Sequence, residues 1–250
     1  YLYVLNSGNN TISRLRLTDP TEDPILDWPT DDPNLIDPSL NNPKGLEVIG
    51  NYLYVTNEGN NSITKINLAN PKTDTTVNWA TNSQGLDNPY GIKYYTDYLY
   101  VTNSGDHSIS KISVANPTTG TTANWATSTQ GLHSPIGLDV YNNYLYVVNS
   151  GNNRISKISL TYPNTSYNAI WGTYYRDINN PNINEPKGLD ISNGYLYVSN
   201  SGNNSISKIS LTNPVNDNSA NWATSTQGLN NPYGIKYYNN YLYVSNFENH

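Results

Sequence analysis

The stretch YLYVTNSGDHSISKISVANPTTGTTANWATSTQGLHSPIGLDVYNN, residues 98–143, contains every element that recurs along this chain. Its opening motif, Tyr-Leu-Tyr-Val, occurs six times, starting at Tyr1, Tyr52, Tyr98, Tyr144, Tyr195 and Tyr241. The spacings are 51, 46, 46, 51 and 46 residues, and the first four of them also separate the Trp residues at Trp28, Trp79, Trp125, Trp171 and Trp222. A period of 46 is too long for one coil of a β-helix and matches one blade of a propeller.

Each repeat offers four segments with the composition of β-strands. In the quoted unit they are Tyr98–Thr102, Ser108–Val114, Thr122–Ala126 around the Trp, and Gly137–Tyr141 after a Pro. Asn-Ser-Gly-Asp, Asn-Pro and Gly-rich turn sequences separate them. No segment keeps a 3.6-residue apolar period beyond about two turns, so no α-helix is predicted. The expected fold is all-β, a β-propeller of four-stranded antiparallel blades.

The composition excludes several classes of protein. The 250 residues include no Cys, which excludes disulfide scaffolds, thiol nucleophiles and Cys-ligated metals. A net charge of −6 disfavours nucleic-acid binding, which needs clustered Lys and Arg. No apolar run approaches the ~20 residues of a membrane-spanning helix, so membrane insertion is not expected. The sequence begins at Tyr1 with no visible leader, and we expect a processed product or an excerpt.

The repeat pattern Pro-x-Gly-[Leu/Ile]-x-[Val/Tyr]…Tyr-Leu-Tyr-Val-x-Asn-Ser-Gly-Asn-Asn-x-Ile-Ser-Lys-Ile resembles the NHL repeat and the related YVTN propeller repeat, and the resemblance covers the whole chain. It implies that the Gly-Leu/Ile strand is innermost in each blade and that the Trp strand is outermost. The chain departs from many NHL repeats by carrying Asn where they carry Asp, at Asn57, Asn103, Asn149 and Asn200. Such propellers bind peptides or RNA, form surface proteins or act as enzymes, so the motif implies a fold and no single function.

We expect one propeller over residues 1–250, with repeat units 1–51, 52–97, 98–143, 144–194, 195–240 and a partial unit 241–250. Six blades are favoured, the last incomplete. The alternative, five blades, would pair Gly234–Tyr238 with Tyr1–Asn6. Asn88–Tyr95 recurs unchanged three repeats later at Asn231–Tyr238, which indicates a tandem duplication of three blades. The second copy would need about 36 further residues to match the first.

The expected inner strands carry charged residues at one equivalent position: Glu47, Lys93, Asp139, Asp190 and Lys236. One interpretation is a charged ring at the channel that binds an ion or a polar ligand. The favoured alternative is pairing of opposite charges between blades. The three carboxylates are also the oxygen ligands that Ca²⁺ prefers, and this possibility stays open. No other cofactor is predicted.

Two insertions, residues 29–42 and 172–185, distinguish the first and fourth units from the others. Because binding residues concentrate on loops held by a rigid scaffold, these loops are the main candidate binding site. One loop is acidic and the other aromatic and charged, and their candidate binding residues are Asp31, Asp32, Asp37, Tyr174, Tyr175, Arg176 and Asp177. Loops that only lengthened after duplication are the alternative.

Catalytic motifs are missing from the sequence. The chain has three His, at His107, His133 and His250, and no Gly-x-Ser-x-Gly, phosphate-loop or dinucleotide motif. We therefore predict a non-enzymatic, asparagine-rich and acidic propeller that binds a protein or peptide or serves as a display scaffold, at a cell surface, outside the cell or on a virion. A lectin that stacks glycans on its Trp rings is the first alternative, although a repeated Trp more often serves packing. A metal-dependent hydrolase or lyase is the second.

Overall fold

The structure is a computed structural model that describes residues 1–18, 25–28, 40–71, 74–168, 171, 183–214 and 218–248. The chain divides into two compact units. Unit 1 comprises Tyr1–Asp106 and Ser110–Asn124, and unit 2 comprises His107–Ile109 and Trp125–His250. Each unit is described by itself below.

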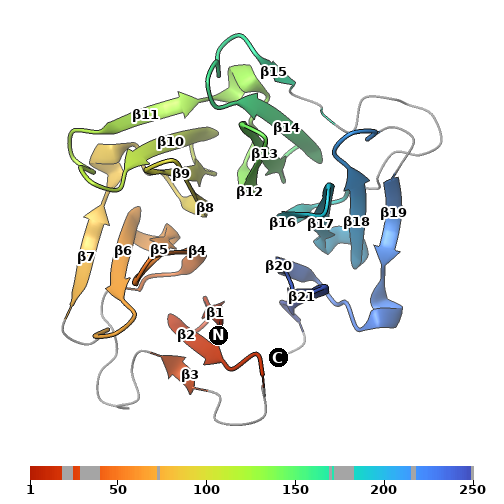
Figure 1. Cartoon of the computed structure of the whole chain (residues 1–250), viewed down its shortest axis with the longest axis horizontal. Coiled ribbons are helices and arrows are strands. Elements are labelled where there is room, and N and C mark those ends of the chain that lie inside the picture. The colour runs from red at the N-terminus through yellow and green to blue at the C-terminus, as the bar shows by residue number, and fades with distance from the viewer. Residues whose placement is uncertain are drawn as a thin grey trace. The chain divides into compact units, whose positions relative to one another are not determined.

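Three antiparallel sheets form in the first half of the chain, each with its strands in sequence order (Figure 1). The first sheet has three strands: β1 (Leu2–Asn6), β2 (Thr11–Leu15) and β3 (Ile25–Trp28). The second has four: β4 (Pro43–Ile49), β5 (Tyr52–Asn57), β6 (Ser62–Asn67) and β7 (Thr75–Ala80). The third, which contributes residues to both units, consists of β8 (Pro89–Tyr95), β9 (Tyr98–Asn103), β10 (Ser108–Ser113) and β11 (Thr121–Ala126).

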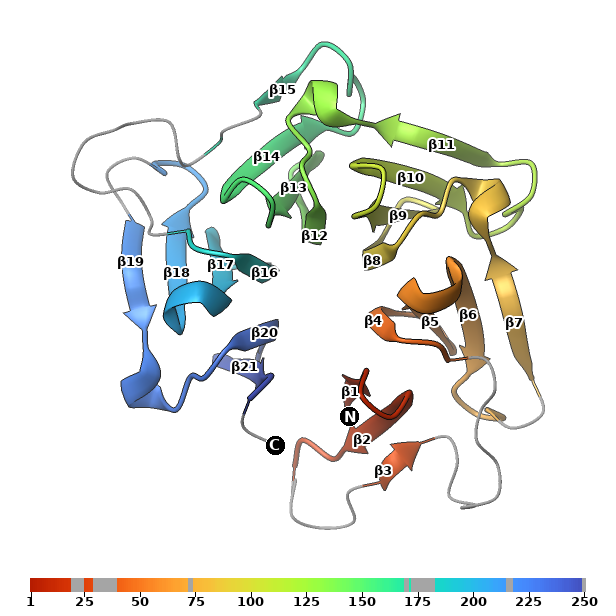
Figure 2. The same cartoon turned by 180° about the vertical axis from the view of Figure 1, so that it is seen from behind.

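Three more sheets form in unit 2 and repeat this pattern (Figure 2). Their first contains β12 (Pro135–Tyr141), β13 (Tyr144–Asn149), β14 (Arg154–Ser159) and the short β15 (Tyr167–Asn168). Their second contains β16 (Pro186–Ser192), β17 (Tyr195–Asn200), β18 (Ser205–Ser210) and β19 (Asn218–Ala223). Their last has two described strands, β20 (Pro232–Tyr238) and β21 (Tyr241–Asn246).

Short connections hold neighbouring strands in register. In the sheets that begin with β4, β8, β12, β16 and β20, a two-residue turn joins the first two strands, such as Asn193-Gly194, where φ values of 50° and 77° suit Asn and Gly. The described part of the chain contains five 3₁₀ turns, at η1 (Glu58–Asn60), η2 (Asn82–Gln84), η3 (Ser128–Gln130), η4 (Ser201–Asn203) and η5 (Ser225–Gln227). Three of them, η2, η3 and η5, begin with a Thr-x-x-Gln capping box. In each box the Thr hydroxyl accepts from a backbone N–H inside the turn, and the Gln side chain accepts from the backbone N–H of the Thr.

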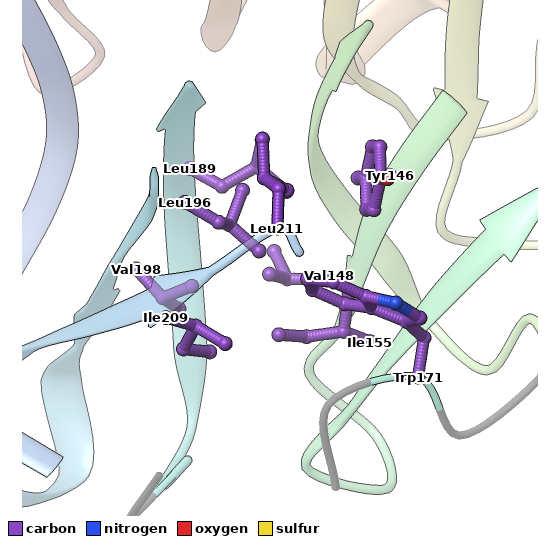
Figure 3. Close-up of a cluster of buried hydrophobic side chains, with 9 residues drawn as sticks. All are labelled: Tyr146, Val148, Ile155, Trp171, Leu189, Leu196, Val198, Ile209 and Leu211. Atoms are coloured by element: carbon purple, nitrogen blue, oxygen red, sulfur yellow. The ribbon is translucent and has the colours of Figure 1, made fainter. Parts of the chain in front are cut away.

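The core lies between successive sheets because each second strand is apolar on both faces. In unit 2, Leu196 and Val198 of β17 are fully buried. They pack with Ile209 of β18 and Leu189 of β16 against Val148 on the preceding sheet (Figure 3). In unit 1, Leu53 and Val55 of β5 are likewise fully buried in the cluster that joins the first two sheets. Buried apolar clusters of this kind therefore join successive sheets inside each unit.

The expected strands are confirmed, and the described residues contain no α-helix. The four segments predicted in residues 98–143 appear as β9, β10, β11 and β12, with ends shifted by one or two residues. Pro232–Tyr238 pairs with Tyr241–Asn246, and β1 pairs with β2. The described strands form six sheets, and the choice between five and six blades stays a prediction.

A candidate binding surface at the Pro–Gly end of the sheets

The Pro-x-Gly motif fixes how neighbouring sheets meet. In unit 2, β16 packs against β20 so closely that a Cβ on Gly188 would lie 2.5 Å from the Tyr233 carbonyl oxygen. Ser199 bridges the two strands: its Oγ accepts from Gly188 N at 2.8 Å and donates to Tyr233 O at 2.6 Å. Glycine is required here by close backbone approach. We call this end of a sheet, where the first strand begins and the second ends, the Pro–Gly end.

The turn between the second and third strands folds onto the Pro–Gly end. In unit 2, the backbone N–H groups of Ser201 and Gly202 donate to the carbonyls of Glu185 and Asn184 at 3.2 and 3.3 Å. In unit 1, those of Glu58 and Gly59 donate to Asn42 and Asn41 at 3.2 and 3.0 Å. The described ends of both insertions are therefore fixed at this end of the sheets.

The predicted loop residues themselves lie outside the described residues. These are Asp31, Asp32, Asp37, Tyr174, Tyr175, Arg176 and Asp177. Their role in binding therefore stays a prediction. The described flanks Asn41, Asn42, Asn184 and Glu185 show where both loops rejoin the sheets.

Unit 2 carries a cluster of two aromatic rings and a lysine at its Pro–Gly end, which we call the aromatic–lysine cluster: Lys187, Tyr233 and Phe247. The Phe247 ring lies 5.9 Å from the Tyr233 ring, and Lys187 Nζ lies 5.8 Å from the centre of the Tyr233 ring. Phe247, the single Phe of the chain, is 62% exposed. An exposed aromatic ring beside a half-buried Tyr and a cation has the composition of a protein-interface anchor.

Lys44 of unit 1 is the equivalent of Lys187, because both are the central residue of a Pro-Lys-Gly motif in the two copies of the three-repeat segment. The surroundings of the two lysines differ. Lys44 Nζ lies 5.6 Å from the Tyr90 ring centre, as Lys187 does from Tyr233. Lys44 also forms an ion pair with Glu58 Oε2 at 3.4 Å, and Asn42 Nδ2 donates to the same oxygen at 2.7 Å. The lysine charge is therefore neutralised within unit 1.

The charged residues of the first strands contact the next first strand along the chain. In unit 1, Glu47 accepts from Tyr94 N at 3.1 Å and lies 3.7 Å from Lys93 Nζ. In unit 2, Asp190 accepts from Tyr237 N at 2.8 Å and from Lys236 Nζ at 2.6 Å. Burial raises the pKa of Asp190 above its ordinary value, although the Lys236 ammonium opposes the shift.

Asp139 follows the same pattern, since its Oδ2 accepts from Ile191 N at 2.9 Å. Glu47, Asp139 and Asp190 thus each accept a hydrogen bond from a backbone N–H of the adjoining first strand. The charged residue at this position therefore has a structural role within each unit. No group of three His, Asp or Glu suited to a metal ion is found in the described ranges. The predicted ion or Ca²⁺ site at Glu47, Asp139 and Asp190 remains a prediction.

Trp79, Trp171 and Trp222 each pack edge to face on the second Tyr of a Tyr-Leu-Tyr-Val motif. Trp171 is buried and meets Tyr146 edge to face at 4.8 Å, and Trp79 meets Tyr54 at 5.0 Å. On each of four sheets a lysine of the third strand lies over the first Tyr of the second strand, 3.9–4.3 Å from its centre. Burial raises the pKa of Tyr54 and Tyr146 to about 12. These stacks are repeated packing devices of the sheets.

Sequence reasoning missed the aromatic–lysine cluster. Two signals were present: Phe247 occupies a turn position that is Ser or Glu in the other repeats, and the variable residue of Pro-x-Gly is Lys or Tyr in four of five copies. Neither signal reveals that Lys187 and Phe247 share one Tyr ring. That contact depends on how β16 and β20 pack.

Comparison with known proteins shows a β-propeller fold. The chain is similar to a structure titled nidogen/laminin complex, with a TM-score of 0.67 and 15% identity over 99% of this chain and 85% of that one. It is also similar to virginiamycin B lyase from Staphylococcus aureus, with a TM-score of 0.62 and 19% identity over 97% and 72%. A streptogramin B lyase structure gives 0.60 and 18% over 97% and 74%. At these identities the likeness concerns the fold.

No protein-family model and no curated protein sequence matches the chain. Within the described parts of the chain, no helix has the length and apolar character needed to span a membrane.

Proposed function

We propose that this β-propeller is a non-enzymatic module that binds a protein partner through the Pro–Gly end of unit 2. The observation that carries the proposal is the aromatic–lysine cluster: an exposed Phe247 rests on Tyr233, which Lys187 also covers. Large aromatic side chains supply most of the binding energy in many protein interfaces. The described end of one predicted loop, Asn184–Glu185, lies at the same end of the sheets.

Two further observations support this proposal. One similar structure is a nidogen propeller in complex with laminin, which gives a precedent for protein binding by this fold. Among the Trp side chains that a lectin would use, Trp171 is buried against Tyr146, whereas Trp222 contacts Tyr197 and is 45% exposed. We place the protein at a cell surface, outside the cell or on a virion, where such a binding module would meet its partner.

Site-specific photocross-linking tests the proposed surface. A photoreactive phenylalanine analogue replaces Phe247 in one variant and Tyr162 in a control. Tyr162 is 65% exposed and follows the third strand of its sheet, so it lies at the end opposite to the Pro–Gly end. We expect a discrete adduct with one protein of the source organism from position 247 and none from position 162. Equal labelling, or no adduct at position 247, would contradict the proposal.

A lyase is the second candidate, because two of the similar structures are lyases. Incubation of the chain with virginiamycin B and divalent cations, followed by mass spectrometry, separates the two candidates. We expect the antibiotic to stay intact. Cleavage that disappears in the Asp139→Asn and Asp190→Asn variants would favour the lyase instead.

A further inference from the structure

We propose that Lys187 binds a carboxylate of the partner protein, and that the partner segment is acidic with an adjoining apolar side chain. This inference rests on the proposed function and names the chemistry of its partner. It comes from the two copies of one surface that the chain carries, one around Lys44 and the other around Lys187.

Unit 1 shows how a carboxylate binds at this position. Glu58 sits at the first residue of the turn that follows β5, where its backbone N–H donates to Asn42 O. From there Glu58 Oε2 reaches Lys44 Nζ at 3.4 Å and accepts from Asn42 Nδ2. Both charged side chains are partly buried, at 16% and 25% exposure, so solvent only partly screens the pair.

Unit 2 keeps the lysine and lacks the carboxylate. Ser201 takes the place of Glu58, with the equivalent backbone bond to Glu185 O. The Ser201 Oγ also donates to Glu185 O at 2.9 Å, so this short side chain is directed to the backbone. Among the described residues, Lys187 forms no ion pair, and its Nζ lies 5.8 Å from the centre of the Tyr233 ring.

The surroundings of Lys187 add an apolar requirement. Phe247 occupies the turn position after β21 that corresponds to Glu58 and Ser201, and its N–H donates to Asn231 O at 2.9 Å. Its ring lies against Tyr233 on the sheet adjoining Lys187. A ligand that places a carboxylate on Lys187 therefore meets two aromatic rings beside it. An acidic residue next to an apolar one satisfies both contacts.

Glu185 limits the acidity of the partner. It stands where unit 1 has Asn42, and its side chain is exposed. A bound carboxylate would meet this negative charge, whereas the Glu58 carboxylate meets an amide donor. We therefore expect one carboxylate to be recognised, and we expect Glu185→Asn to strengthen its binding.

The test is selection from a random heptapeptide library displayed on phage, with the 250-residue chain as target. Selected peptides should contain Asp or Glu beside Phe, Tyr, Leu or Ile. For a synthetic peptide of this kind, Lys187→Gln should weaken binding about tenfold, since loss of one partner of a desolvated charge pair has effects of this size or larger. The matched control Lys44→Gln should leave its affinity within about twofold, because Lys44 is already paired with Glu58.

A second variant copies the unit 1 surface into unit 2. The double change Glu185→Asn and Ser201→Glu should supply the missing carboxylate in cis and abolish peptide binding. Selected peptides without acidic residues, no selected peptides, or acidic peptides that bind all variants equally would overturn the carboxylate site. Cross-linking from position 247 that persists in the double variant would overturn it too and leave the proposed function intact, whereas no adduct in the wild type contradicts the function itself.

Discussion

The segments Asn42–Tyr90 in unit 1 and Glu185–Tyr233 in unit 2 occupy equivalent positions of the repeat. Their buried hydrogen bonds are the same, and their surface residues differ. Thr56 and Ser199 make the same two bonds, at 2.8 Å from the Gly N–H and 2.6 Å to the Tyr carbonyl. At the surface, Asn42 and Glu58 become Glu185 and Ser201. The hydroxyl bonds that join adjoining first strands are the same in both copies. The surface bonds of Glu58 to Lys44 and Asn42 are found in unit 1 and have no counterpart among the described residues of unit 2. Functional differences are therefore to be sought at the turn positions.

The largest expected effect tests the shared interior. Thr56→Val and Ser199→Ala each leave a Gly N–H and a Tyr carbonyl without their hydroxyl partner in a buried site. Because each buried unpaired group costs about 1–3 kcal/mol, we expect each change to lower the free energy of unfolding by at least about 2 kcal/mol. Urea denaturation measures this, with Ser199→Thr as the control that retains the hydroxyl. A loss confined to one copy would show that the two interiors are not equivalent.

A smaller effect should separate the two first-strand carboxylates. Asp190 is 4% exposed and its loss leaves Tyr237 N without an acceptor, so Asp190→Ala should lower the free energy of unfolding by about 1–2 kcal/mol. Glu47 is more exposed, and water can replace its bond to Tyr94 N. Glu47→Ala should therefore cost less than about 1 kcal/mol. Equal losses in urea denaturation would contradict this distinction.

The stability difference between wild type and an Asp190 variant should depend on pH. Burial raises the pKa of Asp190 in the folded state above its unfolded value. The protonated carboxyl therefore favours folding, and this contribution is fully present below the unfolded pKa of about 3.9 and is lost as the pH rises through the folded pKa. Relative to wild type, Asp190→Asn should accordingly be least stable near pH 3 and should gain as the pH rises. Urea denaturation of both proteins between pH 3 and 7 measures this difference. A variant that loses stability relative to wild type as the pH rises would contradict the prediction.

The smallest effect concerns the surface ion pair of unit 1. Glu58→Gln removes the carboxylate from Lys44 and should lower the free energy of unfolding by about 0.5 kcal/mol, as expected for a partly exposed pair. The effect should shrink in roughly 0.5 M salt because added ions screen the attraction. If Glu58→Gln and the wild type are equally stable in low salt, the Lys44–Glu58 pair does not stabilise unit 1, and this prediction is wrong.

Much of the fold could be predicted from the sequence because the repeat fixes local structure. The alternation in Tyr98–Thr102 and Ser108–Val114 predicts strands that the structure confirms as β9 and β10. The fourth strand of the fourth repeat was less predictable. Trp171 falls beyond the two-residue β15 and is nevertheless buried against Tyr146. Its burial comes from packing on Tyr146 and the neighbouring apolar cluster, and not from a strand pattern.

The candidate site could be predicted only in part. The sequence indicated that the turns and insertions are the variable regions, and their described ends do lie at the Pro–Gly end. It offered no reason to group Lys187, Tyr233 and Phe247, which come from β16, β20 and the turn after β21. The charges at Glu47 and Lys93 were recognised as possible partners, yet the backbone N–H of Tyr94 as a partner of Glu47 was not. Such bonds depend on the offset between adjoining strands.

The sequence by itself determined the repeat, the strands and the turns, because alternation, Gly, Pro and Asn act within a few residues of the chain. Only the tertiary structure decided which side chains meet across the turns between strands. Lys44 and Lys187 have the same local sequence, Pro-Lys-Gly, and differ because one faces Glu58 and the other Ser201 across a turn. The contact across the β4–β5 hairpin sets that difference, since a charge is neutralised by what lies near it in space.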